Sequence, residues 1–399
     1  MRLLLLTDMP PCWNYTAGIV LAQLAESLEQ DSLICFCIKH PDVKPVIPDS
    51  LSWMPIKYAT KPRENWRFLP KQLGEIGSFI AQSWTEIYPT LSLRDQIIKF
   101  ARQYKVDAVW CVLQGQTMIR LAVPVANSLG VPLLTEVWDP PRWWLQDNRV
   151  DSLSSKRIFN QFSLALQSSK CCATASWNMA DEYYQRYACQ TIPFIPSLPA
   201  SLAKAPAKNT CQDSEFTIGL AGQIYATDTW NSLLQALDKV NWKLANKSVR
   251  IRVLGRYFNL DVNSSANIEF LGWRSQSECL DILSQTDLLY CPYWFSSKFK
   301  EEARLSFPSK LTTYLAAGRP VFMHAPNYAS PTVFLKNNNA AFCCVSTDPD
   351  QIIASLYEAA TNQTSYQEIA LNGHNAFLQY MTLDILRDNF QKFIMTAKT

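Results

Sequence analysis

Apolar residues along the chain come in short uninterrupted runs, and each run is followed by a turn and then by a stretch with helical spacing. In the first half, the runs predict buried strands at 3–7, 32–39, 108–113, 132–137 and 171–175. Helical spacing predicts helices at 17–30, 95–104 and 117–129. Strands that are apolar on both faces indicate a parallel sheet that is covered by helices on each side.

The same alternation restarts at residue 216 and continues to the end of the chain. Strands are predicted at 216–221, 249–254, 267–271, 287–291, 320–324 and 341–345. Helices are predicted at 229–240, 276–285 and 311–317, and from residues 349, 366 and 384 onward. The sequence therefore predicts an α/β fold with two doubly wound, Rossmann-like domains in series.

A proline-rich stretch at 193–213 separates the two alternating halves. We expect an N-terminal domain over 1–195, a linker over 196–213 and a C-terminal domain over 214–375. A last helix is expected over 376–399, and whether it crosses back to the N-terminal domain is left open. Ligands of open parallel sheets bind beyond the carboxyl ends of the strands, so two such sheets facing a cleft would suit group transfer between two molecules.

The composition limits the class of protein. Of 399 residues, 48% are hydrophobic and 18% are charged, which supplies two large cores and excludes a disordered chain. The formal net charge of +3 is too small to indicate a nucleic-acid partner. No apolar run approaches the roughly 18–20 residues of a membrane span, and the one at the N-terminus is too short for a signal peptide. We therefore expect a cytoplasmic protein.

Twelve cysteines are scattered along the chain, many of them inside apolar runs. No Cys-x-x-Cys and no Asp-x-Asp occurs, and only three histidines accompany the cysteines. We expect free, buried thiols in a reducing compartment, with no dedicated metal and no cofactor.

The clearest candidate for chemistry is the segment 306–321, in which a loop, a helix of small residues, a glycine and a strand follow one another. Pro308 suits the first turn of the helix, and Ser309 can accept hydrogen bonds from its free amides. Those amides attract anions, and Lys310 adds a cation within reach of a diphosphate. Gly318 fits the position just past the helix. A well-capped helix in an α/β core is the alternative interpretation.

This segment resembles the donor segment of retaining GT-B glycosyltransferases of the family 4 type, which has Pro-Ser-Lys-Leu, a helix and an Ala-Ala-Gly-x-Pro-Val end. Further segments match that family in order and spacing between about residues 216 and 360, at 219–223, 253–256, 267–273 and 286–292. The resemblance implies a GT-B fold and transfer of a sugar, with retention, from a nucleotide-sugar. The implied acceptor is a hydroxyl of a glycan or a lipid-linked glycan, in polysaccharide or glycoconjugate biosynthesis.

The chain departs from this family at two acids. By alignment to Gly318, the family's two glutamates fall on Leu305 and Thr313, and Gln223 stands where an arginine is expected. Thr313 can still offer a hydroxyl to the ribose. The donor-binding residues that the resemblance implies are Gly18, which follows the first strand, and Gly222, Gln223, Arg256, Arg304, Phe307, Pro308, Ser309, Lys310, Leu311 and Thr313.

A second candidate site follows the strand predicted at 132–137, where acids, a base and three tryptophans are concentrated. Aromatic faces stack on sugar rings and carboxylates bind hydroxyls. The segment resembles the Asp-x-Trp loop on the acceptor side of related enzymes. Asp139 is the favoured acid beside the reacting hydroxyl, and Glu136 is the second. We place Trp138, Arg142 and Trp143 on the acceptor side. An Asp-Pro turn with packing tryptophans is the alternative.

The segment 53–71 holds five basic residues against one acid, Glu64, with aromatic residues between them. Such a segment could dock on anionic lipid or on a lipid-linked acceptor, at the inner face of the membrane. A solvated loop is the simpler interpretation and the one we prefer from the sequence.

Two other functions remain open at this stage. A non-catalytic GT-B subunit that binds a sugar or a partner is suggested by the missing glutamates. A sugar-nucleotide epimerase is the third hypothesis, although the expected cluster of acids and histidines is not visible in the sequence.

Overall fold

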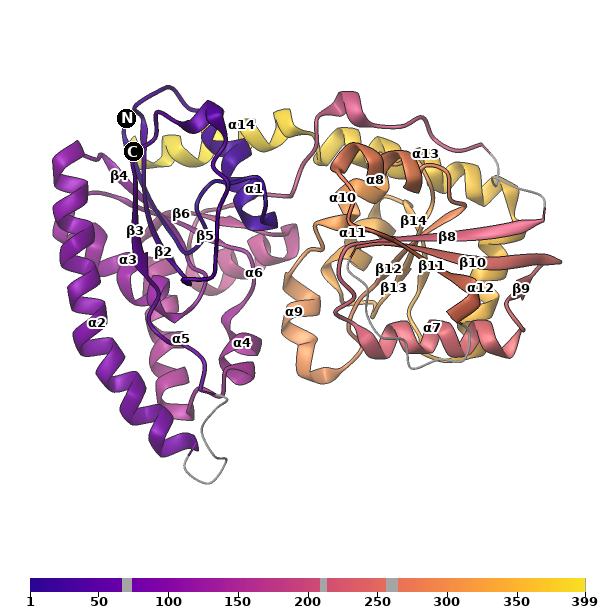
Figure 1. Ribbon diagram of the computed structural model, residues 1–399, viewed down its shortest axis with the longest axis horizontal. Coiled ribbons are helices and arrows are strands. Elements are labelled where there is room, and N and C mark those ends of the chain that lie inside the picture. The colour runs from indigo at the N-terminus through magenta and orange to yellow at the C-terminus, as the bar shows by residue number, and fades with distance from the viewer. Residues whose placement is uncertain (67–73, 209–213, 256–264, 399) are drawn as a thin grey trace. The chain divides into compact units, whose positions relative to one another are not determined.

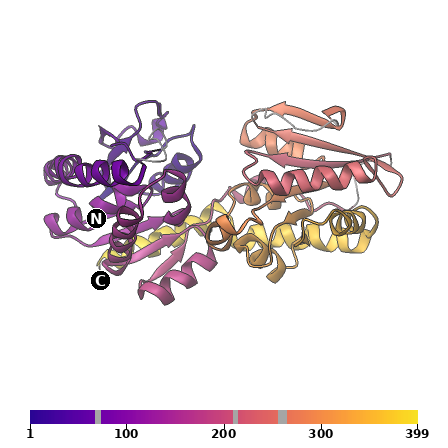
Figure 2. The same ribbon diagram turned by 90° about the horizontal axis from the view of Figure 1, so that it is seen from below.

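The computed structural model describes residues 1–66, 74–208, 214–255 and 265–398, and it divides into two compact units. Unit 1 comprises Met1–Phe194 and Leu386–Thr399, and unit 2 comprises Ile195–Ile385. Each unit holds one sheet with helices around it (Figure 1). Figure 2 shows the marked N- and C-terminal ends beside the elements of unit 1.

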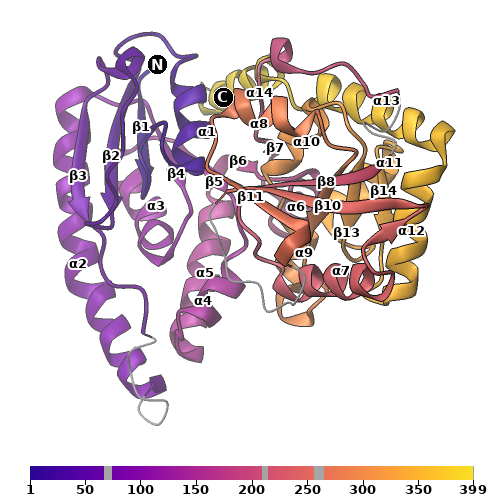
Figure 3. The ribbon, with the colours of Figure 1, turned by 45° about the vertical axis from the view of Figure 1, so that its right-hand side comes forward.

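Unit 1 contains a sheet of seven parallel strands in the order β3-β2-β1-β4-β5-β6-β7. The first four of these strands can be followed in this order in Figure 3. The strand bounds are β1 Leu3–Thr7, β2 Leu33–Lys39, β3 Ile56–Thr60, β4 Ala108–Val112, β5 Leu133–Val137, β6 Ser169–Thr174 and β7 Thr191–Pro193. The order of the strands reverses between β1 and β4, which marks the switch point of a doubly wound sheet.

Helices cover both faces of this sheet. They are α1 Thr16–Ala25, α2 Gly74–Tyr104, α3 Gln116–Leu129, α4 Pro141–Asp147, α5 Ser152–Gln167, α6 Trp177–Tyr187 and α14 Leu383–Met395. Neighbouring residues of β4 show the two faces, because side chains alternate along a strand. The Cys111 thiol reaches the carbonyl of Met118 in α3, whereas the Trp110 ring packs on Phe390 of α14, with ring centroids 5.0 Å apart.

Unit 2 contains a sheet in the order β11-β10-β8-β12-β13-β14, with the short β9 antiparallel to β10. The strand bounds are β8 Glu215–Ala221, β9 Lys243–Leu244, β10 Lys247–Leu254, β11 Ile268–Gly272, β12 Leu288–Pro292, β13 Val321–His324 and β14 Ala341–Cys344. The helices are α7 Thr227–Lys239, α8 Gln276–Leu283, α9 Lys300–Leu305, α10 Lys310–Ala316, α11 Ser330–Asn337, α12 Pro349–Thr361 and α13 Gln363–Tyr380.

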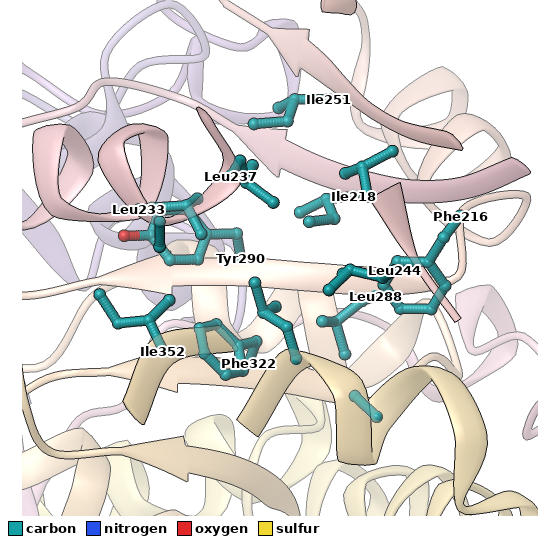
Figure 4. Packing of buried hydrophobic residues seen from close by; sticks show 14 of the residues in the cluster. Phe216, Ile218, Leu233, Leu237, Leu244, Ile251, Leu288, Tyr290, Phe322 and Ile352 are labelled. Atoms are coloured by element: carbon teal, nitrogen blue, oxygen red, sulfur yellow. The ribbon is translucent and has the colours of Figure 1, made fainter. Parts of the chain in front are cut away.

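The core of unit 2 lies between the central strands and the helices α7 and α12. Figure 4 shows Ile218, Tyr290 and Phe322 of three strands beside Leu233 of α7 and Ile352 of α12. All five side chains are buried. Burial of side chains of this size contributes roughly 1.5–3 kcal/mol each, so this cluster is a main source of the stability of the unit.

The strands predicted from continuous apolar runs are all present, with ends shifted by one or two residues. Several elements were not predicted, namely α4, α5, α6 and β7 of unit 1 and β9, α9 and α11 of unit 2. Two further segments of unit 1 differ from the prediction. The helix expected at 95–104 is the last third of the 31-residue α2, and β3 lies inside the segment 53–71, for which a loop was preferred. The edge strand β3 is only partly covered, so it lacks the continuous apolar run of a buried strand. In α2, Pro89 lies inside the helix, where a proline usually indicates that a helix ends or kinks.

Residues 196–208, expected as part of a linker, belong to unit 2. The amide of Lys204 donates to the carbonyl of Ala316, and that of Ala207 donates to the carbonyl of Gly318. Residues 209–213 of the expected linker lie outside the described residues. The C-terminal helix expected from residue 376 is the end of α13 followed by a separate α14, whose residues from Leu386 belong to unit 1.

None of the helices in the described part of the chain combines the length and the apolarity that spanning a bilayer requires. The short 3₁₀ helices are Asp49–Leu51, Ala200–Leu202, Ser265–Asn267, Ser297–Phe299 and Thr396–Lys398.

A buried histidine links three segments at the carboxyl ends of β12 and β13. His324 is fully buried, and its Nε2 lies 2.7 Å from the carbonyl oxygen of Ser346. Since a carbonyl can only accept, Nε2 carries the proton, and in the neutral ring Nδ1 accepts from the hydroxyl of Tyr290 at 3.0 Å. The same hydroxyl lies 3.2 Å from the carbonyl oxygen of Thr229. Burial lowers the pKa of His324 to about 4, although the bond to Ser346 opposes this shift. The imidazole is therefore neutral at physiological pH.

The substitution His324→Leu tests this assignment. At neutral pH the variant should be less stable by roughly 1–3 kcal/mol, because the Tyr290 hydroxyl and the Ser346 carbonyl each lose one hydrogen bond. As the pH falls from about 6.5 to about 4, the wild type should lose stability, since the unfolded chain takes up a proton that the buried ring does not. Leucine does not take up a proton, so the stability of the variant lacks this dependence on pH. The difference between the urea midpoints of wild type and variant should therefore become smaller. A constant difference across this range would contradict a neutral His324.

Candidate functional site

The first candidate site lies in unit 2, where α10 meets the turn after β8. Lys310 is the first residue of α10, and its Nζ donates to the carbonyl oxygen of Gln223 at 2.9 Å. The same Nζ lies 5.1 Å from the ring centroid of Tyr225. The hydroxyl of Tyr314, one turn further along α10, accepts from the amide of Ala221 at 2.8 Å. Lys310 and Gln223, both expected at the donor site, are therefore neighbours.

The turn after β8 exposes bare backbone to this lysine. Gly222 has a φ of +79°, a conformation that favours glycine, and its amide donates to the carbonyl of Leu254. A Cβ placed on Gly255 would lie only 3.1 Å from the carbonyl oxygen of Gly222, so the two glycine turns are in close contact. Without side chains at these positions, a ligand can approach the main chain closely.

Among the described residues, no carboxylate pairs with the ammonium group of Lys310. Its neighbours are the carbonyl oxygen of Gln223 and the face of the Tyr225 ring. Burial lowers the pKa of Lys310 to about 8, and the neighbouring Cys291 opposes this shift. Burial in turn raises the pKa of the Cys291 thiol to about 12. A partly buried cation of this kind gains much from an added anion, because its charge is only partly compensated in the free protein.

The start of α10 differs from the prediction in one respect. The side chain of Ser309 makes no capping hydrogen bond, because its own backbone is already helical and it lies at the surface. The carbonyl of Pro308 instead accepts from the amide of Leu311 at 3.0 Å. Pro308, Leu311 and Phe307 are buried, and the Phe307 ring packs on Phe334 of α11. The buried side chains therefore hold the segment in place, and a ligand could reach the main chain, Ser309 and Lys310.

The other residues expected at the donor site are placed as follows. Thr313 is partly buried, and its hydroxyl accepts from Nε2 of Gln276 at the start of α8, at 3.2 Å. Arg304 is partly buried on α9. Arg256 lies outside the described residues. Gln276 was not predicted, and no local pattern marks it, since the contact with Thr313 joins residues 37 positions apart.

Gly18 lies in unit 1, in the first turn of α1, and its environment gives the reason for a glycine. A Cβ at this position would lie 2.2 Å from the Cys12 sulfur and 3.0 Å from the carbonyl oxygen of Pro10. The loop after β1 thus packs directly on α1. A donor contact of Gly18 stays a prediction.

A cluster of aromatic rings lies next to Tyr225, the residue whose ring Lys310 contacts. The Tyr225 ring lies 4.8 Å from that of Trp294, which lies 4.7 Å from Tyr293 and 5.3 Å from Phe299. Trp294 Nε1 donates to the carbonyl of Tyr225. This cluster was not predicted, although the aromatic pair Tyr293 and Trp294 directly follows the buried strand β12.

The second candidate site lies in unit 1, at the end of β5. Glu136 is only 1% exposed, and its two carboxylate oxygens accept from the indole N–H groups of Trp110 at 3.0 Å and Trp138 at 2.7 Å. Burial raises the pKa of Glu136 to about 7, although both indole groups favour the carboxylate. This corrects the expectation that Glu136 faces a substrate hydroxyl. Glu136 is buried and each of its oxygens accepts from an indole, so it positions the Trp138 ring.

Asp139 remains the acid at this strand end that lies nearer the surface. Asp139, Trp138 and Trp143 are partly buried, and Arg142 is exposed. Pro140 and Pro141 start α4 directly after Asp139, which fixes the direction of the chain there. The Arg142 guanidinium lies 5.2 Å from the ring centroid of Phe159 in α5. The acid and the tryptophan predicted for the acceptor side are therefore close in the chain and lie at one strand end.

Unit 1 also contains a cluster of charged side chains that was not predicted from the sequence. Lys61, just after β3, donates to Asp8, just after β1, at 2.9 Å and pairs with Glu64 at 3.4 Å. Glu64 Oε1 accepts from both the amide and the hydroxyl of Thr117 at 2.7 Å, in the first turn of α3. Burial raises the pKa of Asp8 against the attraction of Lys61. At Gly115, a Cβ would lie 2.6 Å from Glu64. The switch point of unit 1 is thus filled by its own charges.

The described residues contain no group of three or more His, Cys, Asp or Glu side chains that could hold a metal ion. The eleven cysteines among them are free, and most are buried.

Comparisons with known proteins bear on the fold. No protein-family model matches the chain, and no curated protein does. Among solved structures, HepE from Anabaena in complex with UDP is 13% identical, with a TM-score of 0.67 over 99% of this chain and 100% of that one. Sucrose-phosphate synthase from Thermosynechococcus elongatus is 11% identical, with a TM-score of 0.71 over 100% and 99%. The α,α-trehalose 6-phosphate synthase from Burkholderia multivorans is 12% identical, with a TM-score of 0.63 over 100% and 98%.

The fold is GT-B. Similarity over nearly the whole of both chains extends to the two Rossmann-like domains, so the fold predicted from the sequence is confirmed. At these identities the comparisons show the fold alone.

The substitution Glu136→Gln tests the buried carboxylate. Glutamine offers one oxygen to two indole donors, so the variant should be less stable by roughly 1–3 kcal/mol at about pH 5. Because the pKa of Glu136 in the folded protein is raised, wild-type stability should fall as the pH rises from about 4.5 to about 7. The variant lacks this loss, so the gap between their urea midpoints should shrink with rising pH. Parallel pH profiles would show that the pKa is not raised.

Proposed function

We propose that the protein is a glycosyltransferase that moves a sugar from a nucleoside diphosphate sugar to a hydroxyl acceptor. The observation that carries the proposal is the Lys310 ammonium beside the bare turn at Gly222, which offers a cation and main-chain groups to a diphosphate. HepE, which has the same fold, is known in complexes with UDP and with UDP-glucose. This supports a nucleoside diphosphate as the ligand and makes UDP the first one to test.

In this proposal Lys310 acts on the leaving group. When the bond between the sugar and the diphosphate breaks, negative charge grows on the diphosphate oxygens, and a fixed cation stabilises that charge. The Tyr314 hydroxyl holds α10 against the end of β8, so Lys310 is in position before the donor binds. Thr313 and Gln276, which are paired at 3.2 Å, would offer polar groups to the ribose in place of the missing glutamate.

We place the acceptor in unit 1. Asp139 would accept a hydrogen bond from the reacting hydroxyl, and the Trp138 ring would pack on a sugar face. Support comes from Glu136, which fixes the Trp138 indole N–H at 2.7 Å. A glycan or lipid-linked glycan as acceptor, the retaining reaction, the family 4 type and a place in polysaccharide or glycoconjugate biosynthesis rest on the sequence resemblance. We propose that no cofactor or dedicated metal takes part.

A non-catalytic GT-B subunit is the second candidate function. Leu305 and Thr313 stand where the family has glutamates, and Leu305 is fully buried in the hydrophobic interior. No acid is therefore available at that position. Such a subunit would bind a nucleotide-sugar without turning it over.

Removing the Lys310 charge should weaken donor binding. Lys310→Ala should lower the affinity for UDP by roughly 10- to 100-fold, as expected for a lost charge-assisted hydrogen bond. Calorimetric titration of the wild type and the variant measures this. The matched control is Lys239→Ala, which removes an exposed lysine paired with Asp350 in the same unit and should leave UDP affinity unchanged. Equal affinity of wild type and Lys310→Ala would place the phosphates elsewhere.

The same titration has an expected pH dependence. Since the pKa of Lys310 is lowered to about 8, the cation is present below this pH, and UDP affinity should fall as the pH rises through it. Lys310→Arg should keep its affinity to higher pH, because a guanidinium stays charged.

The substitution Asp139→Asn should separate binding from turnover. The variant should lose roughly 100-fold or more in transfer or donor hydrolysis while UDP affinity stays at the wild-type value. Asp181→Asn, which changes an exposed acid on α6, is the control and should be fully active. If the wild type binds UDP but turns over no donor with a broad panel of acceptors, the non-catalytic function is favoured instead.

A further inference from the structure

Helix α2 of unit 1 carries large apolar side chains on its exposed face. Ile80, Trp84 and Tyr88 are 63%, 59% and 63% exposed, and they follow one another at intervals of four residues. The other exposed members lie at helical spacing on the same side of the helix. We call the full set the α2 stripe, and it consists of Ile76, Phe79, Ile80, Trp84, Ile87, Tyr88 and Leu91.

The buried face of this half of α2 is polar. Ser78 and Gln82 are fully buried, and Thr85 is nearly so. The Ser78 hydroxyl donates to Asp151, and Gln82 accepts from Arg120 at 2.8 Å. The first half of α2 is therefore inverted, with polar groups turned toward its neighbours and apolar groups turned outward.

These polar contacts fix the rotation of α2. Glu86 is paired with Arg157 of α5 at 3.3 Å and accepts from Gln161 at 2.8 Å. Rotating the helix to bury the α2 stripe would break these bonds and leave buried polar groups unpaired, at a cost of roughly 1–3 kcal/mol for each group. The exposure of the stripe is thus built into the packing of the unit.

A pocket of about 600 Å³ adjoins the α2 stripe. It lies between the helix, at Ile80, Trp84 and Pro89, and the segment after β3, at Arg63 and Trp66. Arg63 is exposed, which places a cation beside the apolar surface. Among the acids of this region, Glu64 is paired with Lys61 and Glu86 with Arg157, and Glu75 is exposed at the start of α2.

We propose that the α2 stripe docks this protein on the surface of an anionic lipid bilayer. A stripe from residue 76 to residue 91 is about 23 Å long at 1.5 Å per residue, which is too extended for a small ligand. It combines aliphatic side chains with Trp84 and Tyr88, the residue types that settle at the lipid headgroup level, and Arg63 at its edge complements anionic headgroups.

The surface belongs to unit 1 alone, and the inference does not depend on the donor chemistry. The sequence indicated a membrane contact in the segment 53–71. We now place this contact on the exposed face of α2, and from the segment 53–71 only Arg63 takes part.

Co-sedimentation of the full-length protein with vesicles tests the inference. The wild type should sediment with vesicles of phosphatidylcholine and phosphatidylglycerol and much less with phosphatidylcholine alone. The double variant Ile80→Glu with Trp84→Glu should bind the anionic vesicles roughly tenfold or more weakly. The control variant, Leu164→Glu with Tyr184→Glu, changes two similarly exposed apolar residues on α5 and α6 and should bind like the wild type.

Arg63→Glu should weaken binding to the anionic vesicles while leaving the weak binding to neutral vesicles unchanged. Thermal unfolding of each variant verifies that the fold is intact. Failure of the wild type to sediment with anionic vesicles, or equal loss in the stripe and control variants, would overturn the proposal. It would also be overturned by a dimer in light scattering that the double stripe variant converts to a monomer without any vesicle binding.

Discussion

One hydrogen bond ties the helix α10 to the sheet of unit 2, and the candidate donor site depends on it. The Tyr314 hydroxyl accepts from the last amide of β8, at Ala221. Because α10 is held there, the first residue of the helix, Lys310, reaches the carbonyl of Gln223 across a turn that has no side chain at Gly222. Burying a lysine beside neutral groups lowers its pKa and leaves its charge partly uncompensated. The candidate donor site therefore carries a positive charge that the protein itself compensates only in part.

The side chains at the carboxyl ends of the strands differ between the two units. In unit 1, the ends of β1, β3 and β4 are closed by Asp8, Lys61 and Glu64, and Glu64 occupies the first turn of α3 with its own carboxylate. In unit 2, the corresponding edge presents Lys310 and glycine turns, and no carboxylate of the described residues pairs with that lysine. The ends of β1, β3 and β4 in unit 1 are thus closed by charges of the protein, whereas the lysine at the edge of unit 2 has only neutral neighbours among the contacts described.

Buried polar groups also decide which surfaces of unit 1 remain exposed. Both carboxylate oxygens of Glu136 accept hydrogen bonds from indole N–H groups, and this fixes the Trp138 ring at the end of β5. Ser78 and Gln82 fix the rotation of α2 in a similar way and turn its apolar side chains outward. In each case a hydrogen bond inside the unit determines the position of an aromatic group near its surface, because breaking that bond would leave a buried polar atom unpaired.

The sequence by itself determined the buried strands, the two-domain α/β class and the position of Lys310 at the start of a helix, since these depend on local spacing and on residues adjacent in the chain. Gly318, expected just past a helix, has a φ of +70° for the same local reason. Only the tertiary structure decided that Glu136 lies in the core, that Thr313 pairs with Gln276, and that α2 is inverted. These properties depend on contacts between residues far apart in the chain, and no period along the sequence records which distant polar group will be the partner.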